Sequence, residues 1–373
     1  MTDIHDLEIG APGPFLPPYE NVLRNAKTID SLGYDSMAFP DHFAGFVPES
    51  IWTGDITPLS FFQKSPHTYY EISTIMAACA AATENVRLVS AVTEPIRRHP
   101  ILLAQTFLTL DHISNGRAIM GIGAGEIENI EPYGLRYSGQ VGKLREALQI
   151  IRKVWETPEP FDFDGKFWKM KDAVMSLRPV NPDRPPPIWI AAHGPKMIKI
   201  TAEFGDGWIP TLLPPQQYGE RLKEISNHRK KLDKTGPFTS ALWNWCILDE
   251  DPSACQKIKQ NPIAKAFALL YPSNEWKRLG FEHPFGDFNA LTDYIPMRFT
   301  REETLQAMDQ VPEAVLDEFY MAGDSEAIIK KLEEYARVGL NHMIVWNVTG
   351  MFDLERVRSS YKVLKEVLAY IKG

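Results

Sequence analysis

Apolar and polar positions follow two recurring patterns along the chain. Short runs of apolar residues, typical of buried strands, occur about eight times, and segments with apolar residues at helical spacing follow them. The predicted strands lie at 7–11, 35–40, 86–92, 117–122, 187–191, 208–211, 242–248 and 342–347. Predicted helices lie at 19–32, 69–82 and 100–113, and a further one carries an apolar stripe from Leu144 to Trp155. This alternation indicates an α/β protein.

Three of the junctions share one local pattern. In SLGYDSMAF, EFGDGWIP and RVGLNHMIVW, a helix ends near a glycine and an apolar strand begins within a few residues. Glycine tolerates the left-handed conformation that ends many helices, and such joints favour parallel strands with crossover helices. We therefore expect a single (β/α)8 TIM barrel over residues 1–373, with a doubly wound sheet as the structural alternative.

Two segments are too long for ordinary connections. Residues 44–66 follow the second predicted strand, residues 271–300 lie late in the chain, and both are rich in large aromatic residues. The loops that follow barrel strands build the active site in this fold, and long loops often serve as lids or binding elements. We expect both segments to be insertions that determine substrate specificity. Surface insertions without a functional role are the alternative.

Composition narrows the function classes. The chain has 373 residues, of which 40 are Lys or Arg and 48 are Asp or Glu, giving a net charge of −8. This acidic balance argues against broad binding of a nucleic-acid backbone. No apolar run approaches the ~20 residues that span a bilayer, and no signal peptide is visible at the N-terminus. We expect a cytoplasmic protein without a membrane span.

The cysteines offer neither a disulfide framework nor a metal site. Cys79, Cys246 and Cys255 are odd in number, far apart and without CxxC spacing, so each is expected to pack as a small apolar residue. HExxH and GxSxG motifs are absent, which leaves metal and hydrolytic chemistry without support. We predict no metal.

One histidine stands where a barrel would use it. Asp41 and His42 end the second predicted strand, so His42 would lie in the barrel mouth, where its imidazole suits general acid–base work near neutral pH. A hydrogen-bonded structural histidine is the alternative. Arg97 and Arg98, with His99, follow the third strand and either meet an anion or form a solvated face.

Two glycine-containing turns are candidate ligand sites. The run GIGAGE at 121–126 lacks the third glycine of a dinucleotide fingerprint, so it indicates either a simple turn or a close approach of backbone to a planar ligand. The run HGPK at 193–196 joins a predicted strand to a helix. The free N–H groups of a helix N-terminus, with a lysine nearby, suit a phosphate, although an ordinary turn is also possible.

These pieces together resemble the bacterial luciferase-like superfamily, in the branch that uses the deazaflavin coenzyme F420. The resemblance runs from about residue 8 to residue 370 and rests on an ordered set of motifs. They are PDHF, VRLVSAVTEP, HPILLAQTFLTLDHISNGRAIMGIGAGEIEN, DGKFW, IWIAAHGPKM, GDGW and GLNHMIVW. The late stretch HPFGDFNALTDYIP is most similar to phthiodiolone ketoreductase-like members, and GIGAG and GPKM also resemble methylene-tetrahydromethanopterin reductase.

The resemblance implies a (β/α)8 barrel, usually dimeric, with the coenzyme in the mouth. It implies that His42 exchanges a proton with the substrate oxygen while hydride moves to or from C5 of the deazaflavin. It places Asp41 beside the ring, makes Glu126 the acidic residue that protonates or hydrogen-bonds the ring system, and makes Asn129 a coenzyme contact.

The resemblance also implies a set of further coenzyme contacts. Ser90 and Ala91 match a bulge with a non-prolyl cis peptide that backs the ring, and Thr93 matches another contact. The residues that match the phosphate-binding loop are His193, Gly194, Pro195, Lys196 and Met197.

Departures from the sugar-phosphate dehydrogenases of this branch bear on the substrate. Phe46 stands where they carry a tryptophan four residues after the histidine, residues 11–14 contain no carboxylate, and their phosphate-holding cations are not evident. With Phe46 and Trp52 as predicted pocket residues, we expect a larger or more apolar carbonyl compound or alcohol.

The sequence therefore predicts a coenzyme F420-dependent oxidoreductase that acts as a homodimer on a small molecule. Its acidic net charge argues against a nucleic-acid partner. Three alternatives stay open: an F420-dependent methylene-tetrahydromethanopterin reductase, a monooxygenase of the same superfamily that uses FMN, and a non-catalytic coenzyme-binding barrel.

Overall fold

Eight parallel strands close into a barrel. The computed structural model describes residues 2–373. The barrel strands are β1 (Glu8–Pro12), β2 (Ser36–Phe39), β3 (Arg87–Ser90), β4 (Ala118–Ile122), β7 (Ile188–Ile190), β8 (Gly207–Trp208), β9 (Thr239–Leu248) and β11 (His342–Asn347). Each pairs with its neighbour in this order, and β11 pairs back onto β1. This closure confirms the predicted (β/α)8 barrel and excludes the doubly wound sheet, which would leave two open edges.

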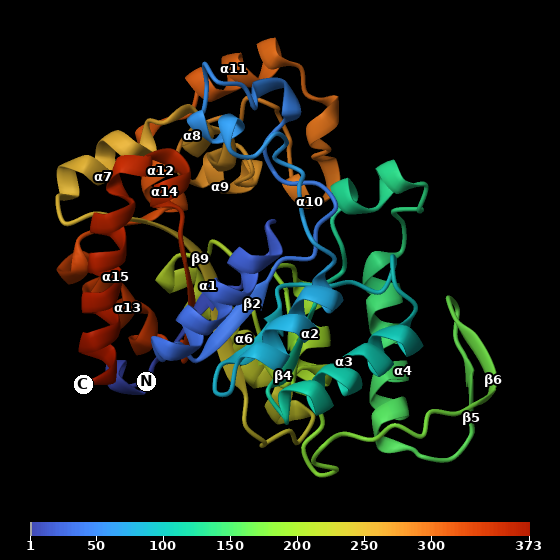
Figure 1. Cartoon of the computed structure of the whole chain (residues 1–373). Coiled ribbons are helices and arrows are strands. Elements are labelled where there is room, and N and C mark those ends of the chain that lie inside the picture. The colour runs from blue at the N-terminus through green and yellow to red at the C-terminus, as the bar shows by residue number, and fades with distance from the viewer. Residues whose placement is uncertain (1) are drawn as a thin grey trace.

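A ring of helices surrounds the barrel (Figure 1). It consists of α1 (Tyr19–Ser31), α2 (Ile72–Ala82), α3 (Pro100–Ser114), α4 (Gln140–Glu156), α5 (Pro195–Phe204), α6 (Pro215–Lys231), α13 (Ser325–Arg337) and α15 (Val357–Lys372). Each presents an apolar stripe to the strands. On α4 the predicted stripe from Leu144 to Trp155 is buried. Burying one large apolar side chain contributes ~1.5–3 kcal/mol, so these stripes fix the helices on the barrel.

Strand alternation divides the interior into two cores. On β9, Leu242 and Cys246 belong to the core between strands and helices, whereas Trp243 and Trp245 belong to a second core that fills the barrel. Successive side chains of a strand point to opposite faces, which produces this division. The inner core continues beyond the C-terminal ends of the strands, where it includes Phe267.

A cap covers the C-terminal end of the barrel. We define the cap as residues 44–66 together with the helices of residues 252–319 (Figure 1). Those helices are α7 (Pro252–Lys259), α8 (Pro262–Ala268), α9 (Ser273–Arg278), α10 (Ala290–Asp293), α11 (Arg301–Asp309) and α12 (Glu313–Phe319). The late insertion is thus longer than the predicted segment 271–300. The spacing of apolar residues in these helices does not distinguish them from the helices that alternate with barrel strands.

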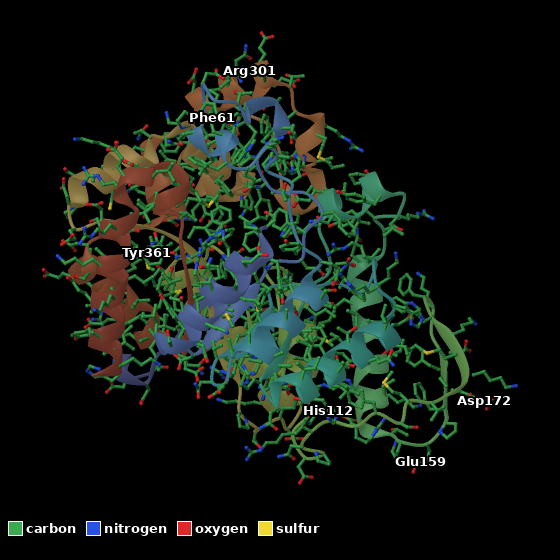
Figure 2. All side chains as sticks on the ribbon, viewed as in Figure 1. Phe61, His112, Glu159, Asp172, Arg301 and Tyr361 are labelled. Atoms are coloured by element: carbon green, nitrogen blue, oxygen red, sulfur yellow. The ribbon has the colours of Figure 1, made fainter. Side chains whose placement is uncertain are left out.

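Side chains tie the two parts of the cap together. Arg301, at the start of α11, donates to the Thr53 hydroxyl at 2.9 Å and pairs with Asp55. The Ser50 hydroxyl donates to the carbonyl of Phe299 at 3.0 Å. Figure 2 shows Arg301 at the outer end of the cap, near Phe61 of the first segment.

A hairpin outside the barrel was not anticipated from the sequence pattern. Strands β5 (Phe161–Asp164) and β6 (Lys169–Ala173) pair antiparallel and lie beside α4 (Figure 1). The carboxylate of Glu146, on α4, accepts hydrogen bonds from three successive backbone N–H groups at the hairpin tip, those of Lys166, Phe167 and Trp168.

The remaining elements are short. They are β10 (Met321–Gly323), which adds to the end of β9, α14 (Thr349–Phe352), and the 3-10 turns η1 (Ile4–Asp6), η2 (Glu49–Ile51), η3 (Pro58–Phe61), η4 (Ile127–Asn129), η5 (Glu131–Tyr133), η6 (Pro296–Arg298) and η7 (Leu354–Arg356). The three cysteines are buried and unpaired, as predicted. Within residues 2–373, every helix is too short or too polar to cross a membrane.

Candidate active site

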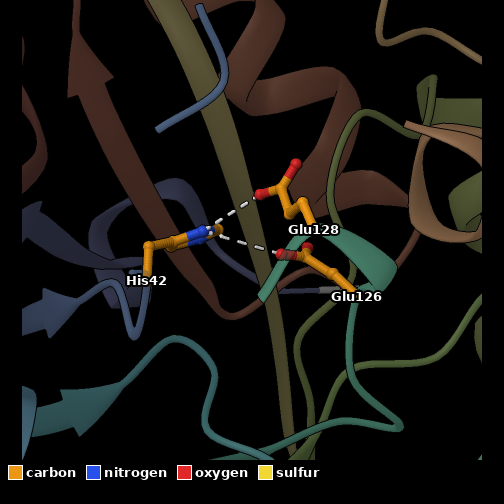
Figure 3. A group of neighbouring side chains, drawn as sticks. All are labelled: His42, Glu126 and Glu128. Atoms are coloured by element: carbon orange, nitrogen blue, oxygen red, sulfur yellow. Dashed lines mark ion pairs between the residues drawn. The ribbon is translucent and has the colours of Figure 1, made fainter. Parts of the chain in front are cut away.

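The loops after β2 and β4 meet at the C-terminal mouth of the barrel. His42 follows the end of β2 by three residues, and the turn η4 follows β4. Because β2 and β4 flank β3 in a parallel barrel, their C-terminal loops emerge at the same end. This topology brings His42 against Glu126, Glu128 and Asn129 (Figure 3).

One ring nitrogen of His42 takes all of these contacts. Its Nδ1 lies 2.9 Å from Asn129 Nδ2, 3.2 Å from Glu128 Oε1 and 3.7 Å from Glu126 Oε2. Among the described residues none hydrogen-bonds Nε2, and the His42 side chain is 9% exposed. The other nitrogen is therefore the one available to a ligand in the mouth.

The two carboxylates differ in how deeply they are buried, and this affects their protonation. The side chain of Glu128 is 2% exposed and that of Glu126 is 32% exposed. Burial, reinforced by the charge of Glu126, raises the pKa of Glu128 to about 7, against the opposing contacts of His42 and Asn129. Burial of the His42 ring opposes its charging, but the two carboxylates outweigh burial and raise the pKa of His42 above its ordinary value.

Asn129 forms the centre of the cluster. Its Oδ1 accepts the backbone N–H of Phe43 at 2.7 Å, and its Nδ2 lies 3.4 Å from Glu126 Oε2 and 3.3 Å from Glu128 Oε1. One ligand atom each of His42, Glu126 and Glu128 lie within 4.8 Å of one another, a spacing that metal ligands share. Here the amide nitrogen already stands among all three, so the cluster is hydrogen-bonded internally.

Asp41 turns away from the mouth and into an ionic network. Its carboxylate pairs with Arg98 at 2.6 Å and with Arg97 at 3.1 Å. Arg97 also pairs with Glu94 at 2.6 Å and donates to the backbone carbonyl of Asp41. Asp41 thereby fixes the loop that carries His42, and its predicted contact with the coenzyme stays a prediction.

The interpretation of Arg97 and Arg98 as a solvated face is wrong. Their side chains are 5% and 13% exposed. They are buried because the carboxylates of Asp41 and Glu94 offset the cost of removing a guanidinium from water. Spacing in the sequence could not show which acidic residues would face them.

Strands β3 and β4 form a close backbone surface beside the cluster. The Ser90 hydroxyl donates to the carbonyl of Gly121 and accepts its N–H, at 2.7 and 2.9 Å. A Cβ on Gly121 would lie 1.8 Å from the Ser90 carbonyl oxygen, so only glycine fits there. The cis peptide joins Ala91 to Val92, one bond later than the predicted Ser90–Ala91 position.

One polar atom of this surface has no protein partner. Thr93 is 2% exposed, and its hydroxyl oxygen is buried without a hydrogen-bond partner among the described residues. Buried hydroxyls are almost always hydrogen-bonded. The predicted ligand contact at Thr93 therefore coincides with an open hydrogen-bonding position.

The N-terminus of α5 opens at the same end of the barrel, after β7. Gly194 is its N-cap and gives no side-chain hydrogen bond, and Pro195 is the first helical residue. The N–H groups of Lys196 and Met197 have no acceptor within the helix, because the first turn leaves them free. With His193 also exposed beside them, this turn can hold an anion such as a phosphate.

Aromatic rings cover the other side of His42. The Phe46 ring lies edge-on at 4.9 Å between centroids and the Tyr69 ring lies at 5.8 Å. Phe46 in turn contacts Trp245, from β9, and Phe267, from the cap, at 6.1 and 6.2 Å. Of the two predicted pocket residues, Phe46 is therefore next to the histidine.

Trp52 occupies a different position. It is 7% exposed in the inner core of the cap, and its indole N–H donates to the carbonyl of Gln63 at 2.7 Å. The structure thus gives Trp52 a part in holding residues 44–66 together, and its predicted contact with substrate stays a prediction.

Sequence reasoning missed Glu128, Tyr69 and Trp245. The signal for Glu128 was present, because EIEN places two carboxylates beside an asparagine in the loop after a strand. The signal for Trp245 was the alternation in LWNW, which puts Trp243 and Trp245 on one face of β9. Nothing local marks Tyr69, which reaches His42 through the fold.

Comparison with known proteins agrees with this architecture. The family model of luciferase-like monooxygenases matches residues 4–342. The phthiodiolone/phenolphthiodiolone dimycocerosates ketoreductase of Mycobacterium tuberculosis is 30% identical over 338 residues, covering 89% of this chain and 88% of that protein. The 5,10-methylenetetrahydromethanopterin reductase of Archaeoglobus fulgidus is 26% identical over 305 residues, covering 81% and 87%.

Two solved structures share the fold. An F420-dependent secondary alcohol dehydrogenase in complex with an F420-acetone adduct superposes with a TM-score of 0.76 at 22% identity, covering 98% of this chain and 99% of that one. The coenzyme F420-dependent tetrahydromethanopterin reductase from Methanopyrus kandleri superposes with a TM-score of 0.72 at 21% identity, covering 97% of each. The resemblance found in the sequence is confirmed, and the chain belongs to the luciferase-like monooxygenase family.

Proposed function

We propose that this protein is a coenzyme F420-dependent oxidoreductase that moves hydride between C5 of the deazaflavin and the carbon of a ketone, aldehyde or alcohol. The observation that carries the proposal is a histidine held by two carboxylates at the barrel mouth, with its Nε2 left to a ligand. Similarity to a ketoreductase over 89% of the chain supports the same reaction class.

The residues of the mouth fit a planar coenzyme with a phosphate. The Thr93 hydroxyl, buried without a partner among the described residues, would hydrogen-bond the coenzyme, and Ser90 and Ala91 would back its ring. The N-terminus of α5, at 193–197, would hold the phosphate through its free N–H groups. When bound, the coenzyme supplies the hydride donor or acceptor at C5.

The side chains of the cluster then have distinct roles. His42 moves the proton to or from the substrate oxygen through Nε2, and the two carboxylates beside the ring favour a proton on the histidine–carboxylate cluster, which suits a proton donor. Glu126, the more exposed of the two carboxylates, would protonate or hydrogen-bond the ring system. Asn129 and Asp41 hold the loops in place. Asn129 binds the backbone of the loop after β2, and Asp41, within that loop, pairs with Arg98 of the loop after β3. Holding the reacting carbon near C5 supplies much of the acceleration.

The surroundings of His42 favour an uncharged substrate. Phe46, Tyr69 and Trp245 form an aromatic surface there. The nearby cations Arg97 and Arg98 are already paired with carboxylates, so they offer little to a phosphorylated substrate. An apolar ketone or secondary alcohol matches such a surface.

Anaerobic titration with F420 and with FMN, followed by a carbonyl assay, tests the proposal. We expect F420 to bind tightly and its reduced form to be oxidised by apolar ketones. Tight binding of FMN alone would favour the monooxygenase alternative. Oxidation only with methylene-tetrahydromethanopterin would favour the reductase alternative, and coenzyme binding without any turnover would favour a non-catalytic barrel.

Two further features of the proposal concern the assembly and its place in the cell. We propose a homodimer that works in the cytoplasm on a small molecule, as the family resemblance and the composition lead us to expect. Sedimentation equilibrium of the purified chain tests the dimer, and a single species at the mass of one chain, 42.3 kDa, would contradict it. Fractionation of cells tests the location.

A further inference from the structure

The orientation of the Asn129 amide is fixed by the backbone. Its oxygen accepts the N–H of Phe43 at 2.7 Å and that of Ala44 at 3.3 Å. A backbone N–H can only donate, so the atom facing these groups must be the amide oxygen. The amide nitrogen therefore faces His42, and Asn129 is 2% exposed, which leaves it little room to turn.

This orientation determines which nitrogen of the neutral His42 ring carries the proton. The amide nitrogen only donates, and it lies 2.9 Å from Nδ1. Nδ1 of the neutral ring must then accept, which places the ring proton on Nε2. Nε2 is the nitrogen without a partner among the described residues, so its N–H points to the ligand side.

The same geometry assigns a proton to Glu128. Its Oε1 lies 3.2 Å from Nδ1. If Nδ1 accepts and Glu128 is ionised, two lone pairs face each other at hydrogen-bond distance, which is unfavourable in a buried site. A proton on Glu128 removes the conflict. The side chain of Glu128 is 2% exposed, and no arginine or lysine among the described residues pairs with it.

We propose that Glu128 holds a proton at rest and passes it to Nδ1 of His42 while Nε2 of His42 gives its proton to the substrate oxygen. Glu128 is then a positioning and proton-storing residue that acts through His42. This inference deepens the proposed function and rests on it for the identity of the acceptor. The shared proton itself rests only on the contacts of residues 42, 128 and 129.

The step balances in the direction of carbonyl reduction. The carbonyl carbon accepts a hydride and its oxygen accepts the Nε2 proton, so the carbonyl is reduced and the hydride donor is oxidised. As the Nε2–H bond of His42 breaks, an Nδ1–H bond forms with the proton of Glu128. The Asn129 amide nitrogen then donates to the carboxylates of Glu128 and Glu126, 3.3 and 3.4 Å away, instead of to Nδ1. Glu128 ends as a carboxylate beside a neutral ring and regains its proton from water. Alcohol oxidation runs the same steps in reverse.

Other groups around the pair do not supply this proton. Glu126 faces His42, and its charge favours a proton on the pair. Arg97 opposes a positive charge on His42. Tyr69, Tyr133 and Tyr294 also feel the charge of Glu128, and burial is the main cause that raises the pKa of each above its ordinary value, so they stay neutral. Burial raises the pKa of Glu128 itself to about 7.

Carbon-13 NMR of the coenzyme-free protein, with labelled glutamate side chains, tests the shared proton without any turnover. Comparison with Glu128→Gln assigns the carboxyl signal. We expect this carboxyl to titrate near pH 7, and nitrogen-15 spectra of His42 to show the proton on Nε2 at the onset of that titration. A Glu128 signal that titrates near its ordinary pKa of ~4.3 would overturn the proposal.

A kinetic experiment tests the use of the proton. Since general acid–base catalysis typically contributes 10²–10⁴-fold, we expect Glu128→Gln to lower kcat for ketone reduction by about 10- to 100-fold with KM little changed. For the wild type we expect kcat to fall above roughly pH 7 as Glu128 loses its proton, and Glu128→Gln should remove this fall. Unchanged kcat and pH profile in Glu128→Gln would overturn the proposal.

Matched controls separate this inference from its rivals. Glu131→Gln changes a half-exposed carboxylate three residues away that pairs with Arg298, and it should change neither the titration nor the rate. Absence of turnover in wild type together with a Glu128 titration near pH 7 would refute the proposed function and uphold the shared proton. A titration near pH 7 that appears only after a chelator is added would show that a metal ion occupies the cluster and would overturn the proposal.

Discussion

The barrel carries a histidine paired with glutamate at each end, and the two pairs behave oppositely. At the mouth His42 contacts Glu126 and Glu128. At the floor, His342 Nδ1 lies 2.8 Å from Glu8 Oε2 and its Nε2 lies 2.8 Å from the Ser36 hydroxyl. The floor cluster joins β1, β2 and β11 where the barrel closes.

The two clusters differ in the charged residues that surround them. Arg87 pairs with Glu8 at 2.6 Å. Burial opposes ionisation of Glu8, but His342 and Arg87 outweigh it and hold the pKa of Glu8 at about 2. Burial and the charge of Arg87 lower the pKa of His342, which is 0% exposed. No arginine comparable to Arg87 reaches the carboxylates of the mouth in residues 2–373, so there the pKa of the histidine rises.

The two histidines also differ in how many of their ring nitrogens have hydrogen-bond partners. Both nitrogens of His342 have protein partners, whereas only Nδ1 of His42 has them. A ring with both nitrogens engaged is fixed in one neutral form and holds strands together. A ring with one free nitrogen can pass a proton to a ligand. Residue types alone therefore do not distinguish a structural histidine from a reactive one.

Replacing each histidine in turn should give the largest effects and test the difference between the two clusters most directly. For His42→Ala we expect kcat for ketone reduction to fall by about 10²–10⁴-fold, because the proton donor is lost, while coenzyme binding is retained. Stopped-flow reduction assays and F420 titration measure the two quantities. Turnover close to wild type would refute the role of His42.

At the floor the effect should fall on stability. His342→Ala leaves the buried Ser36 hydroxyl without its partner and opens a cavity, so we expect unfolding free energy to drop by about 2–4 kcal/mol. Chemical denaturation measures this loss, and turnover per folded molecule should stay near wild type. A stable variant with impaired turnover would mean that the floor cluster is functional.

The two glutamates should give opposite dependences of stability on pH. Glu8 has a lowered pKa, so its contribution is present above its unfolded pKa of 4.5 and is lost as pH falls towards about 2. Glu128 has a raised pKa, so stability declines as pH rises from 4.5 through about 7. Denaturation curves measured across these pH windows give the dependence of the unfolding free energy on pH. Glu8→Gln should lose the dependence between about pH 2 and 4.5, and Glu128→Gln the one between pH 4.5 and about 7. A variant that keeps the wild-type dependence in its own window would contradict the assignment.

The smallest expected effect concerns the two aromatic residues predicted to line the pocket. Phe46→Leu alters the ring that lies against His42, so we expect KM for apolar ketones to rise about fivefold, which corresponds to ~1 kcal/mol, the lower end for small changes in an apolar pocket. Trp52→Phe removes the hydrogen bond to Gln63, and it should lower stability by ~1 kcal/mol with little change in KM. The reverse pattern would place Trp52, and not Phe46, at the substrate.

Local pattern was enough to predict much of the barrel and part of the site. Helix–glycine–strand joints predicted the parallel strands, and the position of His42 after β2 predicted its place at the mouth. The extent of the cap was not predictable, because the apolar residues of its helices follow the same spacing as those of the helices around the barrel. The burial of Arg97 was missed as well, since its partners Asp41 and Glu94 come from two different loops.

The sequence by itself determined the alternation of strands and helices, the barrel, and the place of His42 after the second strand, because these depend on periodicity and on glycine at turns. Only the tertiary structure decided which histidine has a free nitrogen and which carboxylate is buried. His42 comes just after a short apolar strand and His342 just before one, so the sequence around each histidine looks similar. Their pKa values differ because burial and the neighbouring charges, such as Arg87 and Glu126, come from segments far apart in the sequence.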